Sequence, residues 1–410
     1  MPGESKPMLR GKLTALWTRD VDSSRLAGRV KMIQAIREEI SNNYHAEHLR
    51  LRNVLEERKL RSLMGSLLQA LRTVLTGHLP SLQCLLFCDN RNHKLILRHL
   101  RDNPADILYC DGVRCFYFLQ RLSRMRSKMK IVVDMDDLMS RRMELLQRSG
   151  LGLSLGYMSD DAPRWVMRFL THPLLASLIA GWETRALRQV EDEIGRCADN
   201  IVLISPVEAA ELTRRFSKSG AKARVIAIAP PVETVAPPGR YTHFERFAFI
   251  GTDSLLQNYS TIARLIELWK QWSPAATLDI YGAMNHHWSP PPGIRFHGYA
   301  ENLSDVYTDG TVLLAPGVLR GGLKTKVLEA FAFGCAVAGN EITFEGLGLE
   351  DYPQLLDNEA QLSDVILYPE SHLDTFRRAA FTGSQLVARS FSKLSFEKAW
   401  KDILAVGEGR

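Results

Sequence analysis

One stretch of the sequence, residues 321–339 (GGLKTKVLEAFAFGCAVAG), combines the residue types that bind a phosphorylated ligand. Gly321 and Gly322 allow the backbone to approach a ligand closely. Leu323 and Thr325 then begin a predicted helix, whose first N–H groups and positive dipole end attract a phosphate. These residues predict an anion-binding helix start.

Charged side chains follow inside the same predicted helix. Lys324 and Lys326 add mobile positive charge, and Glu329 lies on the same helix face as Lys326, three residues further along. A carboxylate at that position can accept hydrogen bonds from sugar or ribose hydroxyls. Gly334 is typical of a C-terminal helix cap. The same residues also fit an amphipathic helix with a surface Lys/Glu pair, and the sequence pattern leaves both interpretations open.

Two aspartates in the first half of the chain come directly after predicted strands. Asp111 follows residues 107–110, and Asp134 follows residues 131–133. Ligands of open α/β sheets bind at the carboxyl ends of the strands, so both are candidate catalytic groups that orient or deprotonate an acceptor hydroxyl. An aspartate at this point commonly caps the next helix instead, so a structural role remains an alternative.

Asp134 and Asp136 also fit a different chemistry, the nucleophile motif of haloacid-dehalogenase-type phosphatases. That motif expects Thr or Val where Leu138 stands, and the sequence has no matching downstream lysine and paired aspartate. The neighbouring histidines His286 and His287 lie in a proline-flanked loop, which predicts solvated side chains. No metal site is predicted.

Short apolar runs alternate with helical stretches along most of the chain, which predicts parallel sheets with crossover helices. The expected strands cover residues 13–17, 82–87, 107–110, 131–133, 200–204, 225–228, 247–250, 278–281, 294–297, 311–315 and 336–338. The expected helices include residues 25–40, 93–100, 114–128, most of 139–196, 261–271, 325–333 and two helices within 373–406.

A proline-rich break, residues 229–241 (APPVETVAPPGRY), separates two such series and is typical of an interdomain linker. We therefore expect an N-terminal domain over residues 1–228 and a C-terminal domain over 242–385. Residues 386–410 are expected to form a C-terminal helix that packs back on the N-terminal domain. Two successive α/β domains would place a ligand cleft between them.

The charge of the chain is divided unevenly. Residues 1–230 contain 37 Lys and Arg against 25 Asp and Glu, whereas residues 231–410 contain 15 against 21. The six cysteines form no C-x-x-C pair, which favours reduced thiols. The sequence shows neither a secretory signal nor an apolar stretch long enough to span a bilayer, so we expect a cytoplasmic protein.

From Phe247 onward the sequence resembles the donor domain of GT-B glycosyltransferases of family 4. The resemblance is carried by FAFIGTDSLLQN at 247–258, LDIYG at 278–282, IRFHGYAENLSDVYTDGTVLLAP at 294–316 and GGLKTKVLEAFAFGCAVAGNEITFEGL at 321–347. It implies an α/β GT-B fold with two doubly wound parallel-sheet domains. It also implies that this domain binds a nucleotide-sugar as substrate, without a further cofactor or an essential metal.

The resemblance also assigns roles to individual residues. The diphosphate would lie at the helix start formed by Gly321–Thr325, and Glu329 would hold the ribose. The base would lie near residues 296–299, which include His297. Gly251 would lie beside the donor. In the N-terminal domain, Gly28 and Arg29 resemble the glycine loop that faces the acceptor.

Two positions depart from the family pattern. Many members have an acidic residue where Gly321 stands, and many have an Arg and a Lys after the first strand of this domain. Here that segment contains Asp253, and Asn258 stands near the place of the lysine. We therefore expect Lys324 or Lys326 to supply the missing positive charge.

The function implied is transfer of a sugar from a nucleotide-sugar to a saccharide or lipid-linked acceptor, with retention of configuration, in exopolysaccharide or other surface-glycan biosynthesis. The alternatives are the phosphatase built on Asp134 and Asp136, and a noncatalytic scaffold that kept the fold. The basic first half, including the amphipathic stretch 49–75, suits an anionic membrane surface at the inner face of the membrane. An ordinary solvated helix face, with Leu51 and Leu55 in the core, is the alternative. No nucleic-acid partner is expected.

Overall fold

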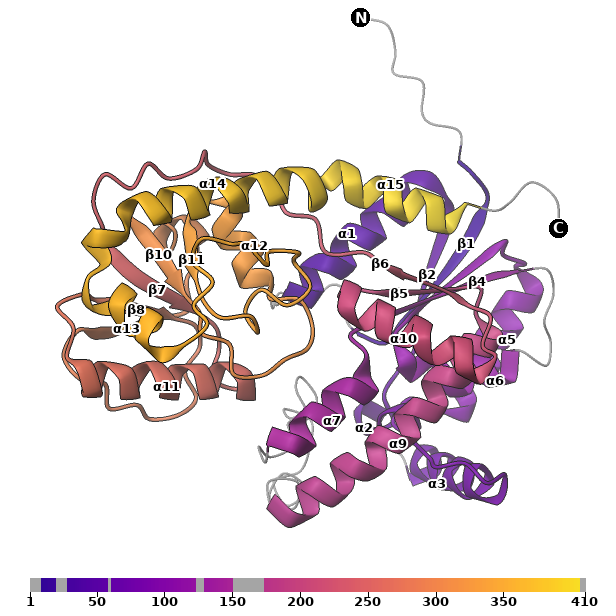
Figure 1. Cartoon of the computed structure of the whole chain (residues 1–410). Helices are drawn as coiled ribbons and strands as arrows, with labels where there is room; N and C mark the ends of the chain where they lie inside the picture. Colours follow the sequence, from indigo (N-terminus) through magenta and orange to yellow (C-terminus); the bar gives the residue numbers. More distant parts are fainter. Residues whose placement is uncertain (1–8, 20–27, 58–59, 123–128, 150–172, 406–410) are drawn as a thin grey trace, which may run out of the picture. The chain divides into compact units, whose positions relative to one another are not determined.

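The computed structural model describes residues 9–19, 28–57, 60–122, 129–149 and 173–405. It divides into two compact units (Figure 1). Unit 1 comprises Met1–Leu153, Met158–Pro230 and Phe396–Arg410, and unit 2 comprises Ser154–Tyr157 and Pro231–Ser395. The division after Pro230 falls inside the proline-rich segment 229–241.

Unit 1 is built on a parallel sheet with the strand order β2-β1-β3-β4-β5-β6. Its strands are β1 (Lys12–Trp17), β2 (His45–Arg50), β3 (Ile107–Asp111), β4 (Lys130–Asp136), β5 (Asn200–Leu203) and β6 (Arg224–Ala227). The order reverses direction between β1 and β3, where the carboxyl ends of the strands separate to admit a ligand in doubly wound folds.

Helices cover both faces of this sheet. Alternate strand residues such as Ala15 and Tyr109 pack against α1 (Gly28–Asn43) and α15 (Lys393–Leu404). The opposite face, which includes Leu108, packs against helices that lie between α1 and α15 in the chain. The remaining helices of unit 1 are α2 (Val54–Glu57), α3 (Leu60–Leu75), α4 (Leu82–Leu85), α5 (Asn90–Asp102), α6 (Phe116–Leu122), α7 (Met139–Ser149), α9 (Pro173–Cys197) and α10 (Pro206–Ser219), with a 3-10 turn at Val113–Cys115.

Unit 2 contains a second parallel sheet, with the strand order β11-β10-β7-β8-β9. Its strands are β7 (Arg246–Ile250), β8 (Leu278–Tyr281), β9 (Ile294–Gly298), β10 (Thr311–Leu314) and β11 (Ala336–Ala338). Its helices are α11 (Leu256–Trp272), α12 (Thr325–Ala332), α13 (Glu359–Leu367) and α14 (Leu373–Ser390), with 3-10 turns at Leu303–Asp305 and Pro369–His372. The order reverses direction between β7 and β10, so the expected ligand position lies where these two strands end.

Residues 82–87 were predicted as a strand, and that prediction is wrong. Leu82–Leu85 form the short helix α4, because Ser81 caps it and the buried carboxylate of Glu183 accepts hydrogen bonds from its first N–H groups. The sequence prediction also missed β2, a polar edge strand that pairs in parallel with β1. All six cysteines are free thiols, and five of them are buried.

Candidate functional site

Three glycines end neighbouring strands of unit 2 and bring their loops together. Gly251 donates to the carbonyl oxygen of Tyr281 at 2.8 Å, and Gly282 donates to that of Gly298 at 2.6 Å. At Gly282, whose φ is 137°, an added Cβ would lie 2.4 Å from the carbonyl oxygen of Gly251. A larger residue would force the two loops apart, so the glycine pair fixes this edge of the sheet.

The start of α12 follows the two glycines predicted to approach a phosphate. Gly321 and Gly322 have φ values of 99° and 63°, which glycine adopts readily and other residues rarely. The N–H of Gly321 donates to Glu345 at 2.7 Å, and the Lys324 ammonium donates to the carbonyl oxygen of Gly321 at 2.7 Å. Lys324 is the N-cap residue but does not cap the helix with its side chain. The positive end of α12 therefore carries a lysine where many helices carry an acceptor side chain.

Lys326 and Asn258 lie together beside this helix start. The Lys326 ammonium donates to Oδ1 of Asn258 at 2.9 Å, and it lies 4.1 Å from the centre of the Phe249 ring. The amide of Asn258 in turn donates to the carbonyl oxygen of Thr252 at 3.0 Å. An added Cβ on Gly251 would lie 2.6 Å from this amide, so Gly251 also makes room for Asn258.

The side chain of Lys326 gains or loses its proton near neutral pH. Burial lowers its pKa most, the nearby Lys324 lowers it further, and Glu329 raises it, with a resulting value of about 7. An anion bound beside Lys326 would favour the protonated form. The predicted donor residues Gly251, Asn258, Gly321, Gly322, Leu323, Lys324, Thr325, Lys326 and Glu329 thus all lie at this edge or on the helix that starts there.

Asp253, one of the two departures from the family pattern, has a clear structural role. It is 1% exposed and accepts from the N–H of Asn285 at 2.7 Å, the N–H of His286 at 2.9 Å and the Trp288 indole at 3.0 Å. Although burial raises the pKa of Asp253, these hydrogen bonds outweigh it and the pKa is lowered. The carboxylate anchors the loop after β8. His286, predicted to be solvated, keeps 54% of its side chain exposed and also pairs with Asp253.

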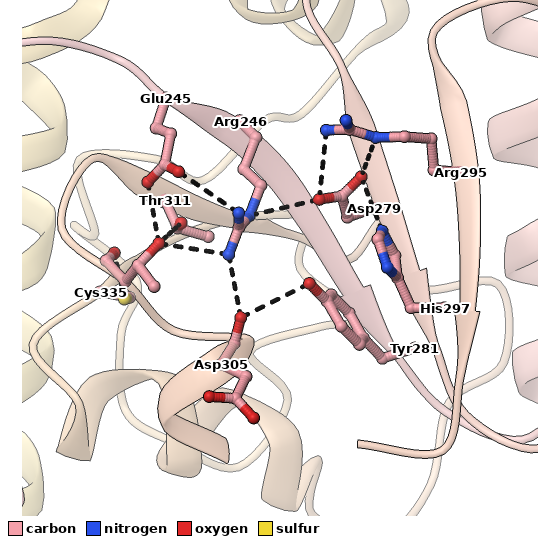
Figure 2. Close-up of polar contacts among 10 residues, drawn as sticks. Glu245, Arg246, Asp279, Tyr281, Arg295, His297, Asp305, Thr311 and Cys335 are labelled. Atoms are coloured by element: carbon pink, nitrogen blue, oxygen red, sulfur yellow. Dashed lines mark hydrogen bonds and ion pairs between the residues drawn. The ribbon is translucent and has the colours of Figure 1, made fainter. Parts of the chain in front are cut away.

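His297, predicted near the base, is held by neighbouring side chains on β8 (Figure 2). Its ring stacks on Tyr281, with centroids 4.7 Å apart, and its Nε2 lies 3.1 Å from Oδ1 of Asp279. Asp279 is 2% exposed and also accepts from Arg295 at 2.8 Å. His297 is thereby fixed in position with its side chain 37% exposed.

Arg246 completes this polar cluster on the same face of the sheet (Figure 2). Its Nε lies 3.5 Å from Asp279, and its Nη2 donates to the carbonyl oxygen of Asp305 at 3.0 Å. Arg246 of β7 therefore links the segment that precedes β10 to strand β8. Sequence reasoning missed Arg246, Asp279 and Arg295, although charged residues inside otherwise apolar strands were a visible signal.

Asp111 and Asp134, the two candidate catalytic groups, are register partners at the ends of β3 and β4. Oδ2 of Asp111 accepts from the Thr18 hydroxyl at 2.9 Å and from the Thr18 N–H at 3.2 Å. Asp134 accepts from the Tyr109 hydroxyl at 2.8 Å. Both side chains are 1% exposed or less. These contacts hold the segment after β1 and the end of β4, which fits the structural alternative as well.

Three further predicted residues, Asp136, Gly28 and Arg29, belong to unit 1. Asp136 has a positive φ of 68°, its backbone N–H donates to Oδ1 of Asp134 at 3.1 Å, and its carboxylate pairs with Arg19 at 3.6 Å. Gly28 begins α1, and the Arg29 side chain lies outside the described residues. Among the residues that the structure describes, no group of three or more His, Cys, Asp or Glu is arranged to hold a metal ion.

None of the helices in the described part of the chain is long and apolar enough to cross a bilayer.

Comparison with known proteins agrees with this geometry. Residues 245–353 match the family described as glycosyl transferases group 1. No match is found among curated proteins. Sucrose-phosphate synthase from Thermosynechococcus elongatus is similar in structure, with a TM-score of 0.63 and 11% identity over 96% of this chain and 98% of that one.

Two further solved structures share the architecture. HepE from Anabaena, in complex with UDP and glucose, gives a TM-score of 0.61 with 10% identity over 96% of this chain and 99% of that one. The trehalose-6-phosphate synthase OtsA gives 0.59 with 9% identity over 97% and 99%. At these identities the likeness concerns the fold. The GT-B fold predicted from the sequence is therefore confirmed, and residues 245–353 are similar to the group 1 glycosyl transferases.

Proposed function

We propose that this chain transfers a sugar from a nucleotide-sugar donor to a saccharide or lipid-linked acceptor in surface-glycan biosynthesis. The observation that carries the proposal is the positive start of α12, where Gly321, Lys324 and Lys326 lie inside the segment that matches the group 1 family. A departing nucleoside diphosphate develops negative charge, and fixed positive groups stabilise it. No essential metal is proposed, because lysines take that role.

Each donor-side residue has a proposed part in binding. The helix start at Gly321–Thr325 would receive the diphosphate, with Lys326 positioned by Asn258 as a cation beside it. Glu329 would accept hydrogen bonds from the ribose hydroxyls. His297 and its neighbours after β9 would lie near the base. HepE binds UDP-glucose, which makes uridine-linked donors the first ones to test.

On the acceptor side, Asp111 and Asp134 remain candidates for orienting or deprotonating the acceptor hydroxyl, and Gly28 and Arg29 for contacting the acceptor. The variants Asp111→Asn and Asp134→Asn would lower the rate of transfer while leaving donor affinity unchanged. A loss of folding stability with unchanged transfer would instead assign the two carboxylates to the structural role that their contacts with Thr18 and Tyr109 support.

Retention of configuration is proposed from the resemblance to family 4. Gly321 stands where many members have an acidic residue, so the stereochemical outcome needs its own measurement. Proton NMR of the first product formed from an α-linked donor distinguishes an α product, which we expect, from a β product.

Thermal-shift screening of nucleotide-sugars, followed by assays of donor hydrolysis and transfer, tests the proposal as a whole. We expect one donor to raise the melting temperature and to be turned over without added metal, also in the presence of EDTA. Glu329→Ala would abolish turnover with the fold intact, whereas Glu267→Ala, an exposed carboxylate on α11, would not.

Two results would contradict the proposal. Donor binding without turnover would indicate a noncatalytic scaffold. Magnesium-dependent phosphate release that is lost in Asp134→Asn would indicate the phosphatase.

We also propose an anionic membrane surface as a partner. Residues 61–130 contain twelve Lys and Arg against four Asp and Glu, so most of the basic excess of the chain lies in this part of unit 1.

A further inference from the structure

The helix α3 has its apolar face turned outward. Leucine, methionine and valine side chains along it are at least half exposed, namely Leu63, Met64, Leu67, Leu68, Leu71, Val74 and Leu75, with exposures between 50% and 77%. Their spacing places them on one continuous arc of the helix surface. A helix that belonged to an ordinary solvated surface would turn this arc toward the core.

The inward face of α3 is small and polar instead. Ser62 and Ser66 are buried, and the Ser66 hydroxyl donates to the carbonyl oxygen of Leu85 at 2.9 Å. Gly65 lies close to Asn90, and the hydroxyls of Thr73 and Tyr117 lie 3.4 Å apart. Polar contacts therefore fix the orientation of α3, and the outward position of its leucines is a property of the fold.

Further apolar side chains are exposed after the end of α3 and on α9. Leu82 is 46% exposed, and Trp182 of α9 is 40% exposed with its indole N–H donating to the carbonyl oxygen of Pro80 at 3.0 Å. Leu178, one turn before Trp182, is 72% exposed. A tryptophan whose polar edge is satisfied and whose ring is partly exposed is typical of a membrane interface.

Exposed basic side chains also occur on α3 and on α5. Arg72 is exposed on α3 itself, and Arg91, Lys94 and Arg98 are exposed on α5, the helix after α4. Asp89, an acidic residue of the same region, is buried and caps α5. An apolar stripe with an exposed arginine on the same helix, in a part of the chain rich in exposed cations, complements a bilayer whose headgroups are anionic.

We infer that α3 lies in the surface of an anionic lipid bilayer, with Leu63, Leu67, Leu71 and Val74 inserted among the acyl chains. The inference gives the proposed membrane partner a defined surface, and it does not depend on transferase activity. Leu51, which the alternative interpretation placed in the core with Leu55, is buried and takes no part. The side chain of Leu55 lies outside the described residues.

The test compares the full chain with the triple variant Leu67→Gln, Leu71→Gln, Val74→Gln in cosedimentation with vesicles of phosphatidylcholine and phosphatidylglycerol. We expect the wild type to bind, more weakly as salt rises, and the variant to bind at least about tenfold more weakly. Leu394→Gln is the matched control, because Leu394 is 76% exposed on α15 and should leave binding unchanged.

A second measurement locates the contact. Brominated lipids should quench the fluorescence of a tryptophan introduced as Leu71→Trp more strongly than one introduced as Leu394→Trp. Equal quenching, or equal binding by the triple variant and the wild type, would overturn the inference. So would a wild-type dimer that the triple variant converts to a monomer, since a second copy would then cover α3. Donor thermal shifts measured without vesicles keep this outcome separate from the proposed function.

Discussion

The ammonium of Lys326 lies 2.9 Å from the side-chain oxygen of Asn258, which joins the first turn of α12 to the first turn of α11. Asn258 stands near the position at which many family members carry a lysine. Lys326 also lies over the ring of Phe249, near the end of β7, and this position supports our proposal that it supplies the positive charge that Asn258 does not.

Replacing Lys326 by methionine should weaken nucleoside diphosphate binding by about ten- to hundredfold, the range for a lost charge-assisted hydrogen bond. Because the pKa of Lys326 is about 7, the wild-type affinity should fall as the pH rises through that value. Calorimetric titration across this range checks both statements.

In the Lys326→Met variant, the affinity should depend on pH only through protonation of the ligand's own phosphate. Lys270→Met, an exposed lysine on α11, is the control and should leave the affinity and its pH profile as they are. A pH profile that Lys326→Met leaves unchanged would assign the titration to another group.

Glu329→Gln should shift the same pH profile to lower pH. The Glu329 carboxylate raises the pKa of Lys326, so its neutralisation lets the ammonium lose its proton earlier. If Glu329 also holds the ribose, affinity should fall about tenfold even below this pH range. Glu267→Gln serves as the control. A lower affinity with an unmoved midpoint would mean that Glu329 acts on the ligand but not on Lys326.

Much of the fold was predictable because strand and helix patterns in parallel α/β domains are locally encoded. Buried strand segments such as residues 247–250 are continuous apolar runs, and the glycines that follow the strands mark the ligand edge. The start of α12 was predictable for the same reason, since its glycines and lysines are adjacent in sequence.

What could not be predicted depends on partners distant in sequence. Residues 82–87 form a helix start because Glu183, about a hundred residues later, accepts from Leu82 and Gln83. The polar edge strand β2 has no apolar pattern of its own. The outward face of α3 is set by contacts of Ser66 with Leu85, which amphipathic periodicity alone does not reveal.

Asp253→Asn should lower the free energy of unfolding of unit 2 by about 2–3 kcal/mol, because buried donors from the loop after β8 lose a charged acceptor. The lowered pKa of Asp253 means that this stabilisation is present above the ordinary aspartate pKa and disappears as the pH falls through the lowered value. Urea denaturation at neutral and at acidic pH measures the difference. Asp364→Asn, with its side chain 58% exposed, should change stability by less than about 0.5 kcal/mol.

Gly334→Ala should destabilise the chain more than Gly220→Ala, although both glycines follow a helix with φ near 70°. Each substitution carries the strain of a left-handed alanine, about 1 kcal/mol. At Gly220 nothing lies within 4 Å of the new Cβ, whereas at Gly334 it would lie 2.1 Å from the carbonyl oxygen of Pro237. The backbone after Pro237 must therefore move, and we expect a total of at least about 3 kcal/mol from urea denaturation. Since α12 ends there, Gly334→Ala should also weaken donor binding. Equal losses of stability in the two variants would show that the backbone of residues 237–238 can move without a measurable loss of free energy.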